Sequence, residues 1–276
     1  MVRKRIALGQ NFFTNPQLVS FLVQNSSLSP DDTVVEIGPG EGIITRELAK
    51  VARKVIAVEM DSALARNLKE RMKSQPNVKI YTGDFLKFDI AGEDYNIFSN
   101  IPFNRTADIV KRILRSEQCR EAYLVVQKEA GEKYTGMPRE TEVSILNKPW
   151  VAAEITHHFK RTDFDPVPST DTVMLHLWRR HDPLVTNHQK EIYRRFVSHG
   201  FHAAKDNLAL SFKNIFTYEQ LKRLSKDLGF PLKVTPSALK FEQWLGLFKY
   251  FLTGVAEEKK LALGLITREG SQAKRG

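Results

Sequence analysis

Strand-like and helix-like segments alternate along residues 33–127, and this alternation restricts the fold more strongly than any other feature of the sequence. Short runs rich in valine and isoleucine predict strands, whereas apolar residues spaced three and four apart predict helices. The expected strands are 33–37, 55–59, 78–82, 95–98 and 123–127, and the expected helices are 43–51, 61–73 and 107–114. Because strands separated by helices usually pair in parallel, we expect a doubly wound, parallel, Rossmann-like α/β sheet.

Segments before and after this alternation extend the expected domain. Asn15 and Pro16 form a cap and first-turn pair that opens an early helix. Residues 150–159 and 172–178 look like two late strands that complete the sheet. The segment 131–148 combines glycine, proline and mixed charge, so we expect a loop or a partly helical cover there.

The pattern changes near residue 181, where His181-Asp182-Pro183 interrupts it. Beyond this point, apolar residues follow helical spacing, which predicts helices over 191–198, 206–212, 218–228 and 241–251. We therefore expect a first domain over 1–180, which includes a basic N-terminal arm over 1–13, and a small all-helical domain over 181–276. The tail from about residue 255 lacks a firm apolar period and is expected to be mobile.

Basic residues are concentrated at the two ends of the chain. Residues 1–30 carry three basic and no acidic side chains, and 181–276 carry 16 basic and 9 acidic ones, whereas 31–180 carry 23 of each. A surplus confined to an arm and a tail domain is typical of phosphate binding, although solvated helix faces are the alternative for any single lysine. The residues predicted to contact RNA are Arg3, Lys4, Arg5, Arg105, Lys190, Arg194, Arg195, Lys205 and Lys213.

Several classes of protein are not expected. The single cysteine, Cys119, excludes an internal disulfide and a multi-thiolate metal site, and the histidines lie at no ligand spacing, so we expect no metal. The sequence has no apolar run long enough to cross a membrane, and its N-terminal residues lack the core of a signal peptide. We expect a cytoplasmic monomer.

A glycine-rich turn, Gly38-Pro39-Gly40-Glu41-Gly42, follows the first expected strand. It allows close backbone approach, and the next helix directs its amides into the same crevice, an arrangement that serves dinucleotides as well as S-adenosylmethionine. Glu59, followed by Met60, ends the second strand, where a carboxylate can accept hydrogen bonds from both ribose hydroxyls of an adenosine. Asp84 ends the third strand and could accept from an adenine amino group while Phe85 packs on the ring. The alternative is that both acids only cap the helices that follow them.

The run Asn100-Ile101-Pro102-Phe103 follows the fourth strand. An adenine amino group is a poor nucleophile because its lone pair is delocalised, so a pair of acceptors that holds both protons favours a pyramidal, attacking nitrogen. The Asn100 side-chain oxygen and the Ile101 carbonyl can form this pair, Pro102 stiffens the turn, and Phe103 offers a face for stacking. The alternative is a plain Asn-x-Pro turn, but its position beside a cofactor turn favours transfer from S-adenosylmethionine.

Five motifs, in chain order, resemble the rRNA adenine N6-dimethyltransferase superfamily. They are Gly9-Gln10-Asn11-Phe12, Glu36-Ile37-Gly38-Pro39-Gly40, Gly83-Asp84, Asn100-Ile101-Pro102-Phe103 and Phe164-Asp165-Pro166-Val167-Pro168. The resemblance covers nearly the whole chain and implies a class I methyltransferase sheet in an rRNA (adenine-N6-)-methyltransferase. It implies that Phe164 joins Phe103 in sandwiching a flipped adenine. The cofactor contacts that it implies are Asn11, Phe13, Gly38, Glu59, Asp84 and Asn100, and Gly40 lies in the same turn.

Two branches of the superfamily differ in their target. The transfer motif, the segment 106–110 and the run 241–248 resemble the erythromycin-resistance (Erm) branch, which methylates an adenine of 23S rRNA and blocks macrolide, lincosamide and streptogramin B binding. Residues 127–130 instead resemble the 16S rRNA dimethyltransferases of ribosome biogenesis. We expect the 23S target. The 16S enzyme, a non-catalytic nucleic-acid-binding relative and, with less support, a nicotinamide dehydrogenase remain alternatives.

Overall fold

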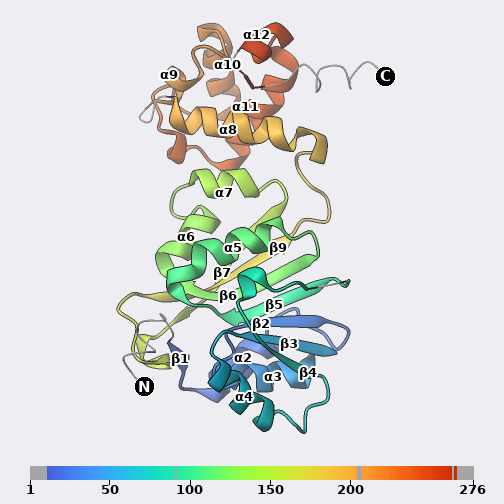
Figure 1. Cartoon of the computed structure of the whole chain (residues 1–276). Coiled ribbons are helices and arrows are strands. Elements are labelled where there is room, and N and C mark those ends of the chain that lie inside the picture. The colour runs from blue at the N-terminus through green and yellow to red at the C-terminus, as the bar shows by residue number, and fades with distance from the viewer. Residues whose placement is uncertain (1–10, 91, 204–206, 263, 266–276) are drawn as a thin grey trace. The chain divides into compact units, whose positions relative to one another are not determined.

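The computed structural model describes residues 11–90, 92–203, 207–262 and 264–265 (Figure 1). The chain divides into two compact units: the first comprises Met1–Gly131 and Ala153–Arg179, and the second comprises Glu132–Ala152 and Arg180–Gly276. The later division lies next to the boundary expected near residue 181. The segment 131–148 was expected to be a loop or a partly helical cover over the edge of the sheet, but from Glu132 onward it groups with the helical unit.

The first unit is built on a seven-stranded sheet with the strand order β4-β3-β2-β5-β6-β9-β7. The strands are β2 (Thr33–Ile37), β3 (Lys54–Glu59), β4 (Val78–Thr82), β5 (Tyr95–Asn100), β6 (Cys119–Gln127), β7 (Val151–Phe159) and β9 (Thr172–Arg179). Strands β4, β3, β2, β5 and β6 pair in parallel. The doubly wound α/β expectation is confirmed, and all seven expected strands are present.

The sheet is not wholly parallel, which corrects one expectation. Strand β9 pairs antiparallel with β6 over seven residue pairs, from Glu121↔Trp178 to Gln127↔Thr172. Parallel strands need a long crossover connection, usually a helix. Strands β7 and β9 are neighbours in the sheet, and the chain between them has only the 3-10 turn η3 (Arg161–Asp163) and the two-residue strand β8 (Phe164–Asp165). This connection contains no crossover helix, so β9 reverses direction after β7 and runs antiparallel to β6.

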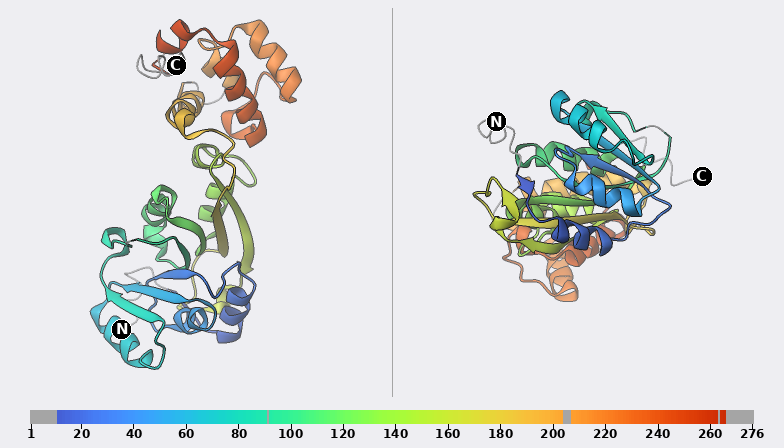
Figure 2. Two further views of the ribbon diagram at one scale, coloured as in Figure 1. Left: turned by 90° about the vertical axis from the view of Figure 1, so that its right-hand side faces the viewer. Right: turned by 90° about the horizontal axis from the view of Figure 1, so that it is seen from below.

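Helices cover both faces of the sheet. They are α2 (Pro16–Gln24), α3 (Ile43–Val51), α4 (Ser62–Arg71) and α5 (Thr106–Arg115). Buried residues of α2 and α3, such as Val19 and Leu48, form one core with Val34 and Val55, and α4 packs over the neighbouring Ala57. The strand order reverses at β2, so right-handed crossovers place α5 on the opposite face, as Figure 2 shows.

The first described residues pair with a distant part of the chain. Strand β1 (Phe12–Phe13) lies antiparallel to β8, with Phe12 opposite Asp165 and Phe13 opposite Phe164. The amide of Thr14 donates to the Asp163 carbonyl at 2.9 Å and extends this two-stranded ribbon. Two of the motifs found in the sequence are therefore joined through their backbones, which their spacing did not indicate.

The second unit is helical. Its helices include α7 (Glu142–Asn147), α8 (Lys190–His202), α9 (Leu208–Phe212), α10 (Tyr218–Leu228), α11 (Phe241–Gly254) and α12 (Glu257–Ala262), and α6 (Lys128–Thr135) begins in the first unit. Aromatic rings fill its core: the Phe196 ring centre lies 4.9 Å from those of Phe212 and Phe251. Gly200 lets α8 approach the Trp244 ring, which a side chain there would strike.

Helix α12 corrects the expectation of a mobile tail from about residue 255. Lys260 is 8% exposed, and its ammonium group donates to the Leu252 carbonyl at 2.7 Å. Residues 266–276 lie outside the described part of the chain. Within the described residues, the structure contains no helix whose length and apolar character would let it span a membrane.

Candidate active site

The site lies where the strand order reverses, between the carboxyl ends of β2 and β5, which is where open α/β sheets bind ligands. Ser99 joins these two strand ends. Its side chain is fully buried, its hydroxyl donates to the Ile37 carbonyl at 2.6 Å, and it accepts from the Ile37 amide at 3.2 Å. Ser99 thereby fixes the cofactor turn against the transfer motif. Sequence reasoning assigned it no separate role, because a serine inside a strand carries no local signal.

The turn after β2 requires its glycines. Gly38, Gly40 and Gly42 have φ values of +64°, +56° and +83°, which lie in the left-handed region that other residues rarely adopt. A Cβ at Gly40 would strike the Phe12 ring. Helix α3 starts directly after Gly42 with no side-chain cap hydrogen bond, so its first amides face the turn without a capping side chain.

Glu59 connects this turn to the end of β3. It is 1% exposed; one carboxylate oxygen accepts from the Gly40 amide at 3.0 Å, and the other accepts from the Asp61 amide at 2.9 Å. Asp61, not Glu59, caps helix α4. The capping alternative therefore does not account for Glu59, which leaves its carboxylate at the cofactor turn.

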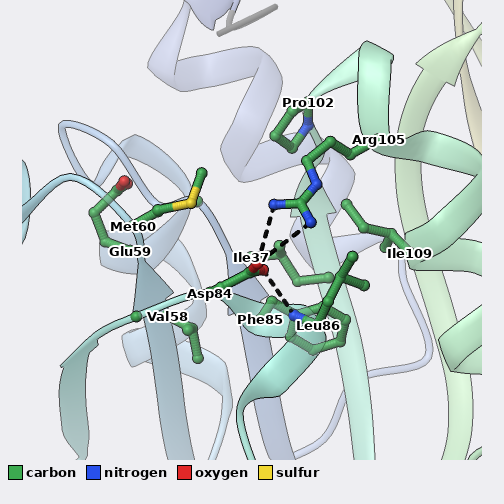
Figure 3. Close-up of a pocket in the computed structure, with 12 residues that line it drawn as sticks. Ile37, Val58, Glu59, Met60, Asp84, Phe85, Leu86, Pro102, Arg105 and Ile109 are labelled. Atoms are coloured by element: carbon green, nitrogen blue, oxygen red, sulfur yellow. Dashed lines mark hydrogen bonds and ion pairs between the residues drawn. The ribbon is translucent and has the colours of Figure 1, made fainter.

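Asp84 lies two residues after the end of β4 and contacts a basic residue from the transfer loop. Its Oδ1 accepts from the Leu86 amide at 2.9 Å, which caps the short 3-10 turn η1 (Phe85–Lys87). Its Oδ2 accepts from both terminal nitrogens of Arg105, at 3.2 and 3.3 Å (Figure 3). Burial opposes ionisation of Asp84, but the Leu86 amide and the Arg105 guanidinium outweigh it and lower the pKa of the carboxyl.

An open cleft lies along the ends of β2, β3 and β4 and reaches the loop after β5. Five predicted cofactor residues line it together: Gly38, Glu59, Met60, Asp84 and Phe85. An added Cβ at Gly38, or at Gly83 beside Asp84, would meet no atom within 4 Å, so bare backbone faces open space there. The cleft therefore fits the nucleoside part of S-adenosylmethionine.

The transfer motif lies at the end of β5. The side-chain amide nitrogen of Asn100 donates to the Asn11 carbonyl at 2.5 Å, which fixes the orientation of the amide. The Ile101 side chain is 2% exposed and anchors the turn, Pro102 lines the cleft, and Phe103 is partly buried. The Asn11 contact brings β1 to the transfer site and leaves the Asn100 Oδ1 as the acceptor.

Two predicted aromatic residues lie in the core instead of the cleft. Phe13 and Phe164 are 7% and 1% exposed, their ring centres lie 4.8 Å apart, and Phe159 packs against both. Neither residue lines the cleft. Phe12, the neighbour of Phe13, is the aromatic residue whose ring lies against the cofactor turn at Gly40. The stacking role of Phe164 stays a prediction, and it would require the ring to leave this cluster.

Glu36, inside β2, is a buried acid whose charge state sequence reasoning did not address. It is 1% exposed and accepts a hydrogen bond from the Thr45 hydroxyl at 2.6 Å. Burial raises its pKa to about 8, Thr45 partly opposes this shift, and the nearby Glu59 carboxylate adds to it. A neutral Glu36 therefore lies behind the carboxylate at the cofactor turn.

The residues predicted to contact RNA are dispersed. Arg105 belongs to the cleft, and in the second unit Arg194 and Lys213 are exposed, Arg195 pairs with Glu191 at 3.0 Å, and the Lys190 ammonium lies 5.4 Å from the centre of the Trp150 ring. The remaining four, Arg3, Lys4, Arg5 and Lys205, lie outside the described residues. Their RNA contacts stay predictions. Over the described ranges, no group of three or more histidine, cysteine or acidic side chains could hold a metal ion.

Comparisons with known proteins agree with this site. The family model for ribosomal RNA adenine dimethylase matches residues 1–252. An rRNA methyltransferase of Streptomyces thermotolerans is 33% identical over 90% of this chain and 83% of that protein. A ribosomal RNA small subunit methyltransferase A of Thermotoga maritima is 33% identical over 82% of this chain and 82% of that protein.

A solved structure agrees as well. The crystal structure of the 23S rRNA methyltransferase ErmE matches with a TM-score of 0.83 and 30% identity, over 88% of this chain and 100% of that chain. The cleft, the glycine turn and the Asn100 motif thus occur in a chain that matches one family from its first residue to residue 252. The chain belongs to the ribosomal RNA adenine dimethylase family and is an S-adenosylmethionine-dependent methyltransferase.

Proposed function

We propose that this enzyme methylates N6 of one adenine in 23S rRNA, once or twice, and thereby confers resistance to macrolides, lincosamides and streptogramin B. The observation that carries the proposal is the position of Asn100 at the end of β5, next to the turn after β2, with its amide nitrogen held by the Asn11 carbonyl. Its oxygen is then the atom that accepts from a substrate amino group.

The residues of the site prepare the nucleophile. S-adenosylmethionine, when bound, supplies an electrophilic methyl carbon on a positively charged sulfur. Asn100 Oδ1 and the Ile101 carbonyl accept hydrogen bonds from the two N6–H groups, which favours a pyramidal nitrogen whose lone pair would point at that carbon. Phe103 stacks on the extruded base and offsets part of the cost of unstacking. As the N–C bond formed, the S–C bond would break and S-adenosylhomocysteine would leave; the methylated nitrogen would release one proton to solvent, so no general base is required.

The ends of β3 and β4 hold the cofactor in this proposal. Glu59 accepts from the ribose hydroxyls, and Asp84 accepts from the adenine amino group, while Phe85 forms part of the wall beside the ring. Met60 is 50% exposed, and its flexible side chain lies at the open side of the cleft. Carboxylates from two neighbouring strands thus recognise the two ends of an adenosine.

The choice of 23S over 16S rRNA has the following support. ErmE shares the fold at a TM-score of 0.83, and Phe103 and the run 241–248 resemble the Erm branch. A second candidate is a 16S rRNA dimethyltransferase. It is favoured by the 33% identity with the Thermotoga maritima small subunit methyltransferase and by residues 127–130.

Transfer of a labelled methyl group tests this choice. Protein-free 23S rRNA and small-subunit particles are incubated in parallel with labelled S-adenosylmethionine, and primer extension locates the product. We expect label at one adenine of 23S rRNA. Label only in the small subunit would assign the enzyme to the 16S branch, and no label in either would favour a nucleic-acid-binding relative without catalysis.

Asn100→Ala tests the mechanism. We expect it to abolish methyl transfer while RNA affinity changes less than about two-fold, because the side chain acts on the amino group and not on the phosphates. Asn104→Ala, in the same loop but exposed, is the matched control and should retain transfer. Equal transfer rates for Asn100→Ala and the wild-type enzyme would refute the role of the Asn100 oxygen.

A further inference from the structure

Arg105 occupies the part of the cleft where the cofactor's adenine is proposed to bind. Its two terminal nitrogens donate to the single oxygen Oδ2 of Asp84, at 3.2 and 3.3 Å, while Oδ1 accepts from the Leu86 amide (Figure 3). The side chains of Arg105 and Asp84 are 31% and 23% exposed. The ion pair is therefore accessible from the cleft but not fully solvated.

We propose that Arg105 is an exchangeable partner of Asp84: the adenine amino group of the cofactor displaces the guanidinium from Oδ2, and the released guanidinium binds a phosphate of the RNA substrate. This inference rests on the proposed function, since it uses Asp84 as the adenine acceptor. It makes Arg105 the residue that couples cofactor binding to RNA binding.

The hydrogen bonds already made at Oδ2 require an exchange wherever the amino group binds that oxygen, while Oδ1 accepts from the Leu86 amide. A carboxylate oxygen accepts about two hydrogen bonds, and both positions on Oδ2 are taken by Arg105. An amino group that approaches Oδ2 must therefore displace a guanidinium nitrogen. Ion pairs with this much solvent exposure are weak, so the exchange costs little.

The position of Arg105 next to Phe103 indicates which group the released guanidinium would bind. Arg105 ends the 3-10 turn η2 (Phe103–Arg105), two residues after the ring proposed to stack on the target base. The Arg105 amide donates to the Pro102 carbonyl at 3.0 Å, and the Thr106 hydroxyl donates to the Phe103 carbonyl at 3.0 Å. These bonds hold the backbone while the long side chain changes partner. A guanidinium beside a stacked base is well placed for the phosphate of the same nucleotide.

Binding of S-adenosylhomocysteine, measured by calorimetry without RNA, tests the exchange at the cofactor side. We expect Arg105→Met to bind it about five-fold more tightly than the wild type, because no ion pair has to be broken. Arg105→Lys keeps the charge but has no pair of guanidinium nitrogens to donate, so its affinity for S-adenosylhomocysteine should lie between those of the wild type and Arg105→Met. Lys111→Met removes one exposed positive charge from α5 and is the control; its affinity should stay within about two-fold of wild type. Weaker or unchanged binding by Arg105→Met would overturn the proposal and make Arg105 a residue that orients Asp84.

A cofactor analogue isolates the contact. The purine-riboside analogue of S-adenosylhomocysteine carries hydrogen in place of the 6-amino group and has no N1 proton, so its base cannot donate to Asp84. We expect Arg105→Met to bind this analogue no more tightly than the wild type does. Equal tightening for both ligands would overturn the exchange at Oδ2, because it would then reflect only added space or altered charge.

RNA binding tests the second half of the proposal. With a synthetic RNA that contains the adenine located by primer extension, S-adenosylhomocysteine should tighten RNA binding to the wild type and leave binding to Arg105→Met unchanged, since the coupling is reciprocal. The dependence of RNA affinity on salt should also fall by about one phosphate contact in Arg105→Met. Equal coupling in both proteins would refute the role of Arg105. Methyl transfer by the wild type, measured in parallel, reports separately on the proposed function.

Discussion

Glu36→Gln should change how the stability of this protein depends on pH. Glu36 is buried in β2, and burial raises the pKa of its carboxyl from 4.5 to about 8. In the unfolded chain the group ionises near its ordinary pKa, so between about pH 4.5 and 8 the folded state binds a proton that the unfolded state has lost. The contribution to stability is complete below pH 4.5 and is lost as the pH rises through 8.

The size of the effect follows from this difference in pKa. At 1.36 kcal/mol per pH unit, the interval from 4.5 to about 8 corresponds to a loss of at most about 5 kcal/mol of unfolding free energy in the wild type. Glutamine has nearly the same shape, can accept from the Thr45 hydroxyl, and has no proton to lose. Glu36→Gln should therefore be within about 2 kcal/mol of wild type at pH 5 and clearly more stable than wild type at pH 9.

Urea unfolding followed by circular dichroism at several values between pH 5 and 9 measures this difference. Contributions from other titrating groups are common to both proteins, so only the difference between the two curves is interpreted. Glu117→Gln, at an exposed position, is the control and should run parallel to the wild type at every pH.

Parallel curves for Glu36→Gln and the wild type would refute the reasoning, because they would mean that Glu36 ionises in the folded protein as easily as in the unfolded chain. A difference that grows with pH would support a neutral Glu36 behind Glu59. A neutral Glu36 would then avoid the coulombic repulsion that Glu59 exerts on it.

Three further predictions test other parts of the structure. Gly40→Ala should lower the unfolding free energy by about 1–3 kcal/mol and weaken S-adenosylhomocysteine binding, because the φ of +56° is strained for alanine and its Cβ strikes the Phe12 ring; thermal melting and calorimetry measure both effects. Phe164→Ala should cost about 3–5 kcal/mol in urea unfolding because the ring is 1% exposed, and a loss below about 1 kcal/mol would contradict its place in the core. Burial raises the pKa of Cys119 to about 12, so a disulfide reagent at pH 8 should label this thiol only after denaturation; rapid labelling of the native protein would contradict its burial.

The local pattern of the sequence was enough to predict the sheet and the position of its cleft. Apolar periodicity located the seven strands of the main sheet, and Gly38 and Gly40 indicated the cofactor turn because left-handed backbone favours glycine. Glu59 and Asp84 follow strands that pair in parallel, and the carboxyl ends of parallel strands meet at one edge of a sheet. These inferences needed only the order of elements and the rules of strand pairing.

Contacts between distant segments could not be predicted in this way. The pairing of β1 with β8, the Asn11 carbonyl on Asn100 and the burial of Phe164 against Phe13 depend on how the N-terminal residues return to the sheet. No periodic signal spans 150 residues of chain. Local spacing also gave no reason to expect segment 132–152 in the helical unit, because helix α7 is short and its hydrogen-bond partners lie on α8.

For single side chains, too, local sequence predicts the position, whereas tertiary packing decides the charge state and the partner. The sequence by itself determined that Gly38, Glu59 and Asp84 reach the cleft, because strand ends and glycine turns are set by local backbone preference. Only the tertiary structure decided their state: Arg105, expected to contact RNA, pairs with Asp84, and Glu36 is buried with a raised pKa. Charge state and partner choice depend on solvent exclusion and on the distance between charges, and both arise only when segments remote in sequence pack together.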